Sequence, residues 1–184
     1  RFAAQQGVED MKRIAGVLAQ GKSLAFFPEG TFSRIPGLLP FRLGAFAAAR
    51  RRAPRAQLVL VGDGPARREL QARCPEAILA GVRRGEDLAA CYASADVFLF
   101  PSLTETYGNV TTEAMASGLA VIAFDYAAAA ALIHHGKTGL LARFGDAGAF
   151  CALAAGLVAD PAAIAALGAE ARHTAASHDW TRVV

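Results

Sequence analysis

Short apolar runs alternate with longer helix-forming stretches along the chain, and this alternation restricts the fold more than any other feature. Nearly continuous apolar strands occur where both faces of a sheet are covered, so the pattern predicts a parallel sheet between two layers of helices. The predicted strands are 23–27, 57–62, 77–80, 96–100, 120–124 and 139–141. The predicted helices are 7–20, 41–52, 65–74, 86–93, 109–117, 127–135, 146–158 and 161–177.

Three loops with glycine, arginine or glutamate follow predicted strands. They are Gly62-Asp-Gly64, Gly81-Val-Arg-Arg84 and the segment Glu105 to Asn109. In a Rossmann-like α/β sheet the carboxyl ends of the strands form the ligand-binding edge, so these loops should lie at one edge. At 184 residues the chain is long enough to be one such domain, residues 1–184, with a sizeable core.

The loop and helix from Pro101 to Gly118 carry the most chemical information. Seven residues separate Glu105 from Glu113, and Gly108 stands just before a helix that begins near Asn109. The free N–H groups and dipole of a helix start suit a diphosphate. One turn into the helix, Glu113 is placed to accept hydrogen bonds from sugar hydroxyls. A capped helix with two solvated acids is the plainer alternative, but the whole string favours a nucleotide-sugar site.

Five blocks of the chain form a recognisable series: Leu58–Pro65, Gly81–Arg84, Tyr92–Ser102, Glu105–Gly118 and Gly136–Leu141. Through these blocks, residues 53–184 resemble the C-terminal, donor-binding half of the retaining glycosyltransferases of family 4 (group 1), which have the glycosyltransferase B fold. The Tyr107-Gly-Asn-Val110 and Phe124-Asp-Tyr-Ala-Ala128 variants look most like members that use GDP-mannose.

The resemblance implies a role for each matching residue. Gly62 and Gly64 allow close backbone approach, Val82 and Arg83 flank the base, and Glu113 holds the ribose. Gly108, Asn109 and Val110 contact phosphate beside Tyr107, and Glu105 reaches the donor sugar as the catalytic residue. It implies a GDP- or UDP-linked sugar donor as substrate and no cofactor. A metal is not implied, because the chain has no Asp-x-Asp motif.

The first fifty residues resemble a different family, the lysophosphatidic acid acyltransferases, through Phe27-Pro-Glu-Gly-Thr31 and the arginine that follows. That resemblance implies acceptor-binding roles for Glu29, Gly30, Thr31 and Arg34. The family also needs a histidine base with an aspartate five positions later. None of the four histidines, His134, His135, His173 and His178, has one. A turn between a strand and a helix is therefore the preferred interpretation of Pro28 to Arg34.

The two resemblances together predict a chimera. The acyltransferase-like segment, 1–50, should supply the first strand and helix of the sheet, with residues 24–27 parallel to 58–61. Since the chain begins with Arg and the N-terminal acceptor domain of the family has no counterpart, we expect a fragment that is inactive alone. Two alternatives stay open: a non-catalytic nucleotide-binding or scaffold module, and a phospholipid acyltransferase fragment.

The net charge of +3 gives no dense basic stripe, so nucleic acid is not an expected partner. The cluster Arg50–Arg52 makes a weak contact with anionic lipids conceivable. Without a signal peptide or convincing span, a cytoplasmic location follows, with the inner face of the membrane as a variant. Three widely spaced cysteines, Cys74, Cys91 and Cys151, predict buried small side chains.

Overall fold

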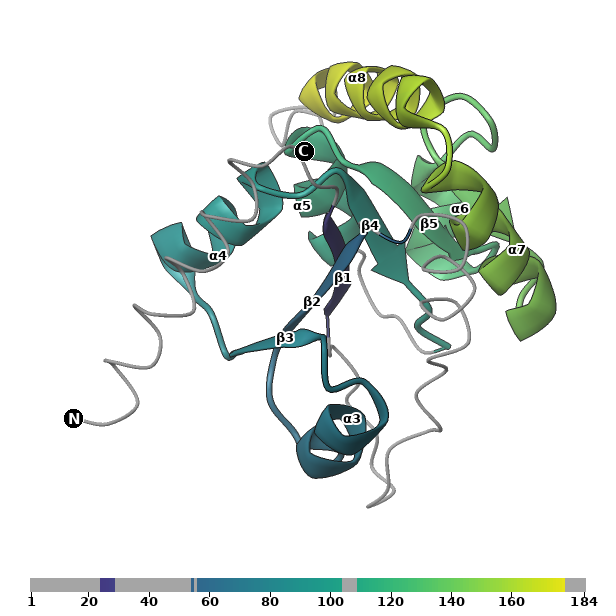
Figure 1. Cartoon of the computed structure of the whole chain (residues 1–184). Helices are drawn as coiled ribbons and strands as arrows, with labels where there is room; N and C mark the ends of the chain where they lie inside the picture. The colour runs from purple at the N-terminus through teal and green to yellow at the C-terminus, as the bar shows by residue number, and fades with distance from the viewer. Residues whose placement is uncertain (1–23, 29–53, 55, 104–108, 178–184) are drawn as a thin grey trace.

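Six parallel strands form one sheet in a computed structural model that describes residues 24–28, 54, 56–103 and 109–177 (Figure 1). The strand order is β3-β2-β1-β4-β5-β6, the doubly wound order in which the chain reverses direction across the sheet between β1 and β4. The strands are β1 (Leu24–Pro28), β2 (Gln57–Val61), β3 (Ile78–Gly81), β4 (Val97–Phe100), β5 (Ala120–Phe124) and β6 (Leu140–Ala142).

The helices that connect these strands cover both faces. They are α3 (Arg67–Arg73), α4 (Gly85–Ala93), α5 (Asn109–Ala116), α6 (Ala127–Leu132), α7 (Ala147–Leu157) and α8 (Pro161–Ser177). The predicted α/β class with helices on both faces is therefore confirmed. The predicted helices 7–20 and 41–52 lie outside the described residues.

Alternate residues of β2, β3, β4 and β5 enter two separate cores, because successive side chains of a strand point to opposite faces. Leu58 and Leu99 pack with Leu70 of α3 and Phe150 of α7 on one face. The opposite face has its own core, in which strand residues pack against the helices α4 and α5; its members include Val59, Phe98, Val121, Cys91, Tyr92, Ala114 and Met115. The sheet, including the edge formed by the carboxyl ends of its strands, is thus held by packed side chains on both of its faces.

The central strand β1 comes from the acyltransferase-like segment. It pairs in parallel with β2, with Leu24 opposite Gln57 and Phe27 opposite Leu60, and on its other side with β4. The predicted pairing of these two strands is confirmed. The predicted position of the loop from residue 29 to Arg34, beside Gly62-Asp-Gly64, falls outside the described residues.

Two local predictions were wrong. The helix expected to continue to His135 ends at Leu132, because Ile133 is extended and a turn follows, in which the His134 N–H donates to Thr138 Oγ1 at 2.9 Å. The cysteines were predicted to be buried, but Cys74 and Cys151 are half-buried and only Cys91 is enclosed. Cys74 is the C-terminal cap of α3, at the rim of the core.

Within the described residues, no single helix is long and apolar enough to cross a membrane. The helices α7 and α8 pass that test of length and composition only as a pair, and they are bent by 106° at the break between them.

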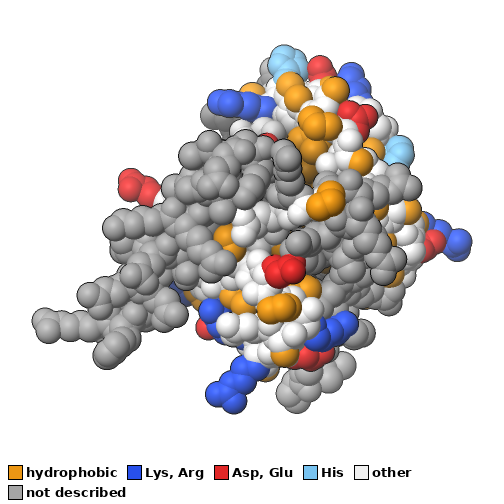
Figure 2. All heavy atoms as spheres, viewed as in Figure 1, with side chains coloured by type: hydrophobic (Ala, Val, Ile, Leu, Met, Phe, Trp, Pro, Cys, Tyr) orange, Lys and Arg blue, Asp and Glu red, His pale blue; other side chains and the backbone are white. Residues whose placement is uncertain are grey.

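Charged side chains gather over α3 at the bottom of the surface in Figure 2, where Arg73 Nη1 contacts Glu69 Oε1 at 3.0 Å.

Candidate functional site

The loops after β2 and β3 are joined at the carboxyl edge of the sheet. The Gly62 N–H donates to the Gly81 carbonyl at 2.9 Å, and Arg67 Nη2 donates to the Leu79 carbonyl at 3.3 Å. Gly62 has φ +136° and Gly81 φ +72°, conformations that side-chain-bearing residues rarely adopt. The expected need for glycine at position 62 therefore has a backbone reason that is independent of any ligand.

The backbone N–H of Gly64 is already hydrogen-bonded within its own loop. Its N–H donates to Asp63 Oδ1 at 2.9 Å, and the same carboxylate lies 3.8 Å from Arg67 Nη1. The Asp63 side chain thus already accepts the hydrogen of the Gly64 N–H, which in a phosphate-binding loop would be available to the ligand. What Gly64 still offers a ligand is the absence of a side chain.

The loop after β3 presents one apolar and one cationic side chain. Val82 is 59% exposed. Arg83 is half-buried, and its Nε is enclosed with no hydrogen-bond partner among the described residues. Arg84 precedes α4 in an extended conformation and is exposed. An open apolar side chain beside guanidinium groups suits a ligand with a flat ring and negative charge.

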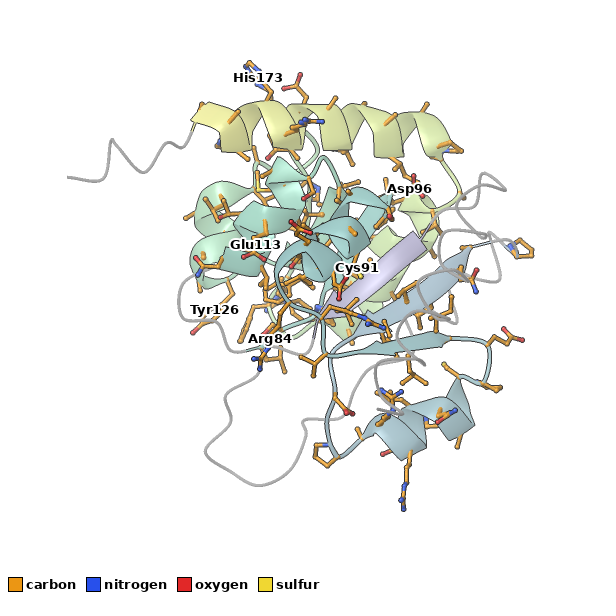
Figure 3. All side chains as sticks on the ribbon, turned by 90° about the vertical axis from the view of Figure 1, so that its left-hand side faces the viewer. Arg84, Cys91, Asp96, Glu113, Tyr126 and His173 are labelled. Atoms are coloured by element: carbon orange, nitrogen blue, oxygen red, sulfur yellow. The ribbon has the colours of Figure 1, made fainter. Side chains whose placement is uncertain are left out.

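The pKa of the buried Cys91 thiol of α4 is raised. Desolvation by burial is the largest cause, the positive charge of Arg83 acts in the opposite direction, and the charge of Asp87 adds to the rise. Figure 3 shows Cys91, Arg84 and Glu113 on the side of the molecule where α4 and α5 lie.

The helix α5 begins at the carboxyl end of β4, after the half-buried segment from Pro101 to Leu103. Its first residues are the exposed Asn109 and the half-buried Val110. Thr111 is fully buried, and its Oγ1 has no hydrogen-bond partner in the part of the chain that the structure describes. Buried hydroxyls are nearly always paired, so this one marks the first turn of α5 as chemically unusual.

Glu113 is exposed on α5, and Tyr92 of α4 is buried. Burial raises the pKa of Tyr92 well above its usual value, and the negative charge of Glu113 adds to the rise. Sequence reasoning gave Tyr92 no role, because the effect of a charge on another helix leaves no trace in residue spacing. The only signal was its place at the end of an otherwise apolar helix face.

The structure places the predicted site residues unequally. Seven of the predicted donor-binding residues follow or flank the carboxyl ends of β2, β3 and β4, which share one edge because the strands are parallel: Gly62, Gly64, Val82, Arg83, Asn109, Val110 and Glu113. The predicted residues Glu105, Tyr107, Gly108, Glu29, Gly30, Thr31 and Arg34 lie outside the described residues.

The fold is that of a doubly wound, Rossmann-like domain, and the loops after β2, β3 and β4 lie at the carboxyl edge, where sheets of this kind bind their ligands. The family model described as "Glycosyl transferases group 1" matches residues 37–160, more than half of the chain, and the chain belongs to that family. A second model, described as "Acyltransferase", matches residues 1–61, which include β1 and β2. The two matches overlap between residues 37 and 61.

Two curated relatives illustrate the similarity. A GDP-mannose-dependent alpha-mannosyltransferase of Mycolicibacterium smegmatis is 46% identical over 117 residues, which are 63% of this chain and 28% of that protein. The sulfoquinovosyl transferase SQD2 of Arabidopsis thaliana is 35% identical over 132 residues, 69% of this chain and 26% of that protein. The chain thus spans about a quarter of the length of these relatives.

Solved structures agree on the fold. Sucrose-phosphate synthase from Thermosynechococcus elongatus has a TM-score of 0.71 and 28% identity, covering 92% of this chain and 46% of that one. Anabaena HepE in complex with UDP and glucose has a TM-score of 0.70 and 21% identity, covering 92% and 48%. The described fold therefore corresponds to about half of a GT-B glycosyltransferase, as predicted.

Proposed function

We propose that this chain is the donor-binding half of a retaining glycosyltransferase and that it binds the nucleoside diphosphate of a GDP-linked sugar. The observation that carries the proposal is the place of Glu113, a carboxylate one turn into α5 at the carboxyl end of the central strand β4. In the family that the chain belongs to, this is where a ribose would be held. The mannosyltransferases among its relatives, which are named as GDP-mannose-dependent, support GDP over UDP.

The proposed binding mode follows from the residues at the carboxyl edge of the sheet. Glu113 accepts hydrogen bonds from the two ribose hydroxyls, and the exposed Val82 covers one face of the base. The first N–H groups of α5, at Asn109 and Val110, face the diphosphate, where the positive end of the helix dipole favours negative charge. Arg83 and Arg84 add positive charge at the neighbouring strand end. Glu105 keeps its predicted role at the donor sugar.

Transfer of the sugar is proposed to need a second domain. The chain spans about half of the solved structures that it matches, and an acceptor hydroxyl has to be delivered from outside the described edge. We propose that the acyltransferase-like segment acts here as a structural part of the sheet, since its strand β1 pairs with β2 and β4. The donor is expected to bind without a metal ion, so EDTA should leave its affinity unchanged.

Isothermal titration of the 184-residue chain with GDP, UDP and ADP tests the proposal. GDP should bind most tightly, and Glu113→Ala should weaken its binding. Removing a charged hydrogen-bond acceptor costs about 1.5–3 kcal/mol, which is roughly 10- to 150-fold in affinity.

Glu170→Ala is the matched control, because Glu170 is also an exposed glutamate on a helix, α8. It lines a groove together with Lys137, which precedes β6 and so lies at the amino end of that strand, away from the proposed site. It should leave GDP affinity unchanged. Equal affinities of the wild type and Glu113→Ala, or no binding of any of the three nucleotides at millimolar concentration, would refute the proposal.

A further inference from the structure

Four aromatic rings form a continuous row from the core to the surface at the carboxyl ends of β5 and β6. Phe150 of α7 is buried and lies against Phe124, the last residue of β5, with the ring centroids 5.2 Å apart. Phe144 meets Phe124 in a T-shaped arrangement at 6.2 Å, and Tyr126 lies against Phe144 at 4.5 Å with the planes tilted by 33°. The two outer rings are thus anchored to the core through the two inner ones.

The two outer rings, Tyr126 and Phe144, form an aromatic pair that is open to solvent. They are 44% and 47% exposed although they contact each other. Single apolar side chains on a surface are ordinary, but two aromatic rings exposed side by side leave apolar area whose burial by a ligand is favourable. The aromatic pair is therefore a candidate binding surface.

The backbone holds the aromatic pair in position. The Asp125 N–H donates to the Ala142 carbonyl at 2.7 Å. This bond joins the segment before Tyr126 to the segment before Phe144 where the two strands end. Tyr126 is extended, and Ala127 after it has φ +48°, a left-handed conformation that alanine adopts only at an energetic cost. Strain of this kind gathers at binding sites, and rings that are already held in place lose little freedom when a ligand binds.

The aromatic pair lies at the same edge of the sheet as the proposed donor site. The strands β4, β5 and β6 are consecutive and parallel, and Figure 3 shows Tyr126 on the side of the molecule where Glu113 and Arg84 lie. Neighbouring strands are about 4.8 Å apart, so the carboxyl ends of β5 and β6 are roughly 5 and 10 Å beyond that of β4. The proposed donor site uses the loops after β3 and β4, so the aromatic pair lies beside that site and outside it.

Charged side chains flank the aromatic pair. Asp125 and Arg143 directly precede the two rings in the chain, and both are exposed. Phe124 is opposite Ala142 in the sheet, so the two charged residues follow at the same level. A carboxylate accepts hydrogen bonds from hydroxyls, and a guanidinium donates them. Aromatic rings bordered by these two groups suit a molecule that has an apolar face and hydroxyls around its rim.

A hexopyranose ring has this combination. Its faces carry C–H groups that are slightly positive, because each carbon also bears an oxygen, and the face of an aromatic ring is negative. We propose that Tyr126 and Phe144, with Asp125 and Arg143 beside them, bind the pyranose ring of a glycoside that is separate from the nucleotide donor. This inference goes beyond the proposed function, because the glycoside binds with or without a nucleotide.

The probe is methyl α-D-mannopyranoside, titrated at millimolar concentrations into the 184-residue chain. The aromatic proton–carbon NMR signals of Tyr126 and Phe144 should shift and saturate, both in the presence and in the absence of GDP. Tyr126→Leu keeps apolar bulk and removes the ring. It should weaken glycoside binding by about 2- to 12-fold, the equivalent of the ~0.5–1.5 kcal/mol that an aromatic contact contributes, and leave GDP affinity unchanged.

Tyr126→Phe restores the ring and should recover most of the glycoside affinity, which a role of the hydroxyl alone would not allow. Phe144→Leu tests the second ring and takes the place of Tyr126→Leu if that variant does not fold. Cyclohexanol is the matched probe, since its ring has the same size but lacks the row of polarised C–H groups. It should bind more weakly than the glycoside.

Four results would overturn the proposal. The glycoside produces no saturable shift, or cyclohexanol binds equally well and the aromatic pair is a general apolar surface. Tyr126→Leu weakens binding of GDP-mannose but not of GDP while the free glycoside does not bind, which assigns the rings to the donor sugar. Sedimentation shows a dimer that dissociates in Tyr126→Leu, which assigns them to a second copy of the chain. A chain that binds the glycoside but not GDP would refute the proposed function and support this inference.

Discussion

Gly168 lets α8 lie directly on the backbone of the turn that ends α5, and replacing it should loosen that contact. It is buried in α8, and a Cβ added there would overlap the carbonyl oxygen of Gly118. Gly118 has φ +80°, so its own conformation leaves little room for adjustment. Because the opposing atom belongs to backbone, no change of side-chain rotamer relieves the overlap.

The expected cost follows from two opposed effects. Inserting a methyl group into a well-packed contact costs about 1–3 kcal/mol, and the rigid partner places Gly168→Ala near ~3 kcal/mol. The higher helix propensity of alanine returns about 1 kcal/mol. The net loss of about 2 kcal/mol corresponds to a fall in Tm of roughly 4–8 °C for a chain of this length.

Gly156→Ala is the matched substitution. Gly156 lies in α7, is exposed, and an added Cβ would have nothing within 4 Å. Only the propensity term applies there, so stability should rise by about 0.5–1 kcal/mol. Thermal unfolding followed by circular dichroism measures both changes. If Gly168→Ala raises Tm as Gly156→Ala does, α8 is not seated on Gly118 and the packing argument fails.

Two further predictions concern ionisation and the acyltransferase-like segment. Burial raises the pKa of Cys91, and burial together with the Glu113 charge raises the pKa of Tyr92. In the unfolded chain these groups ionise with pKa values of about 8.5 and 10. At a pH just above those values, both groups therefore stay protonated in the folded chain and are ionised in the unfolded chain. The two protonated groups therefore contribute fully to stability below the unfolded-state pKa values, and this contribution is lost as pH rises beyond them. In urea unfolding, the free energy of unfolding should decline above about pH 9, and the decline should be less steep in Cys91→Ala. A free energy of unfolding that stays constant up to about pH 11 would contradict this. The chain should also transfer no acyl group from acyl-CoA to lysophosphatidic acid, since no histidine has an aspartate five positions later. Turnover that disappears in Glu29→Ala would overturn that expectation.

Much of this fold could be predicted, because buried parallel strands are almost continuously apolar, and β1 to β4 end at glycine or proline. The strand 120–124 was predicted with its observed bounds, and the pairing of β1 with β2 followed from the need of Gln57–Val61 for a partner. The end of α6 could not be predicted. Its alanine-rich sequence carries no stop signal, and the turn that replaces its last residues depends on the Thr138 hydroxyl.

The candidate site was predictable only at the level of single loops. Spacing placed Glu113 on the first turns of a helix and Val82 in the loop after a strand, and both lie there. Spacing could not show that the Gly64 N–H donates to Asp63. Such a contact depends on the conformation of the loop and of the aspartate side chain, and neither property can be deduced from the sequence of one segment.

Because β1 lies in the centre of the sheet, the unit that can fold begins earlier in the chain than the match to the sequence family does. The glycosyl transferase match begins at residue 37, after β1, yet β1 lies between β2 and β4. A protein trimmed to the family boundary would fall into two smaller sheets, β3-β2 and β4-β5-β6, each with a newly unpaired edge open to aggregation. Val82 and Glu113 would then be on different pieces. Anyone who excises this domain, or recombines it with another, has to carry a central strand across with it.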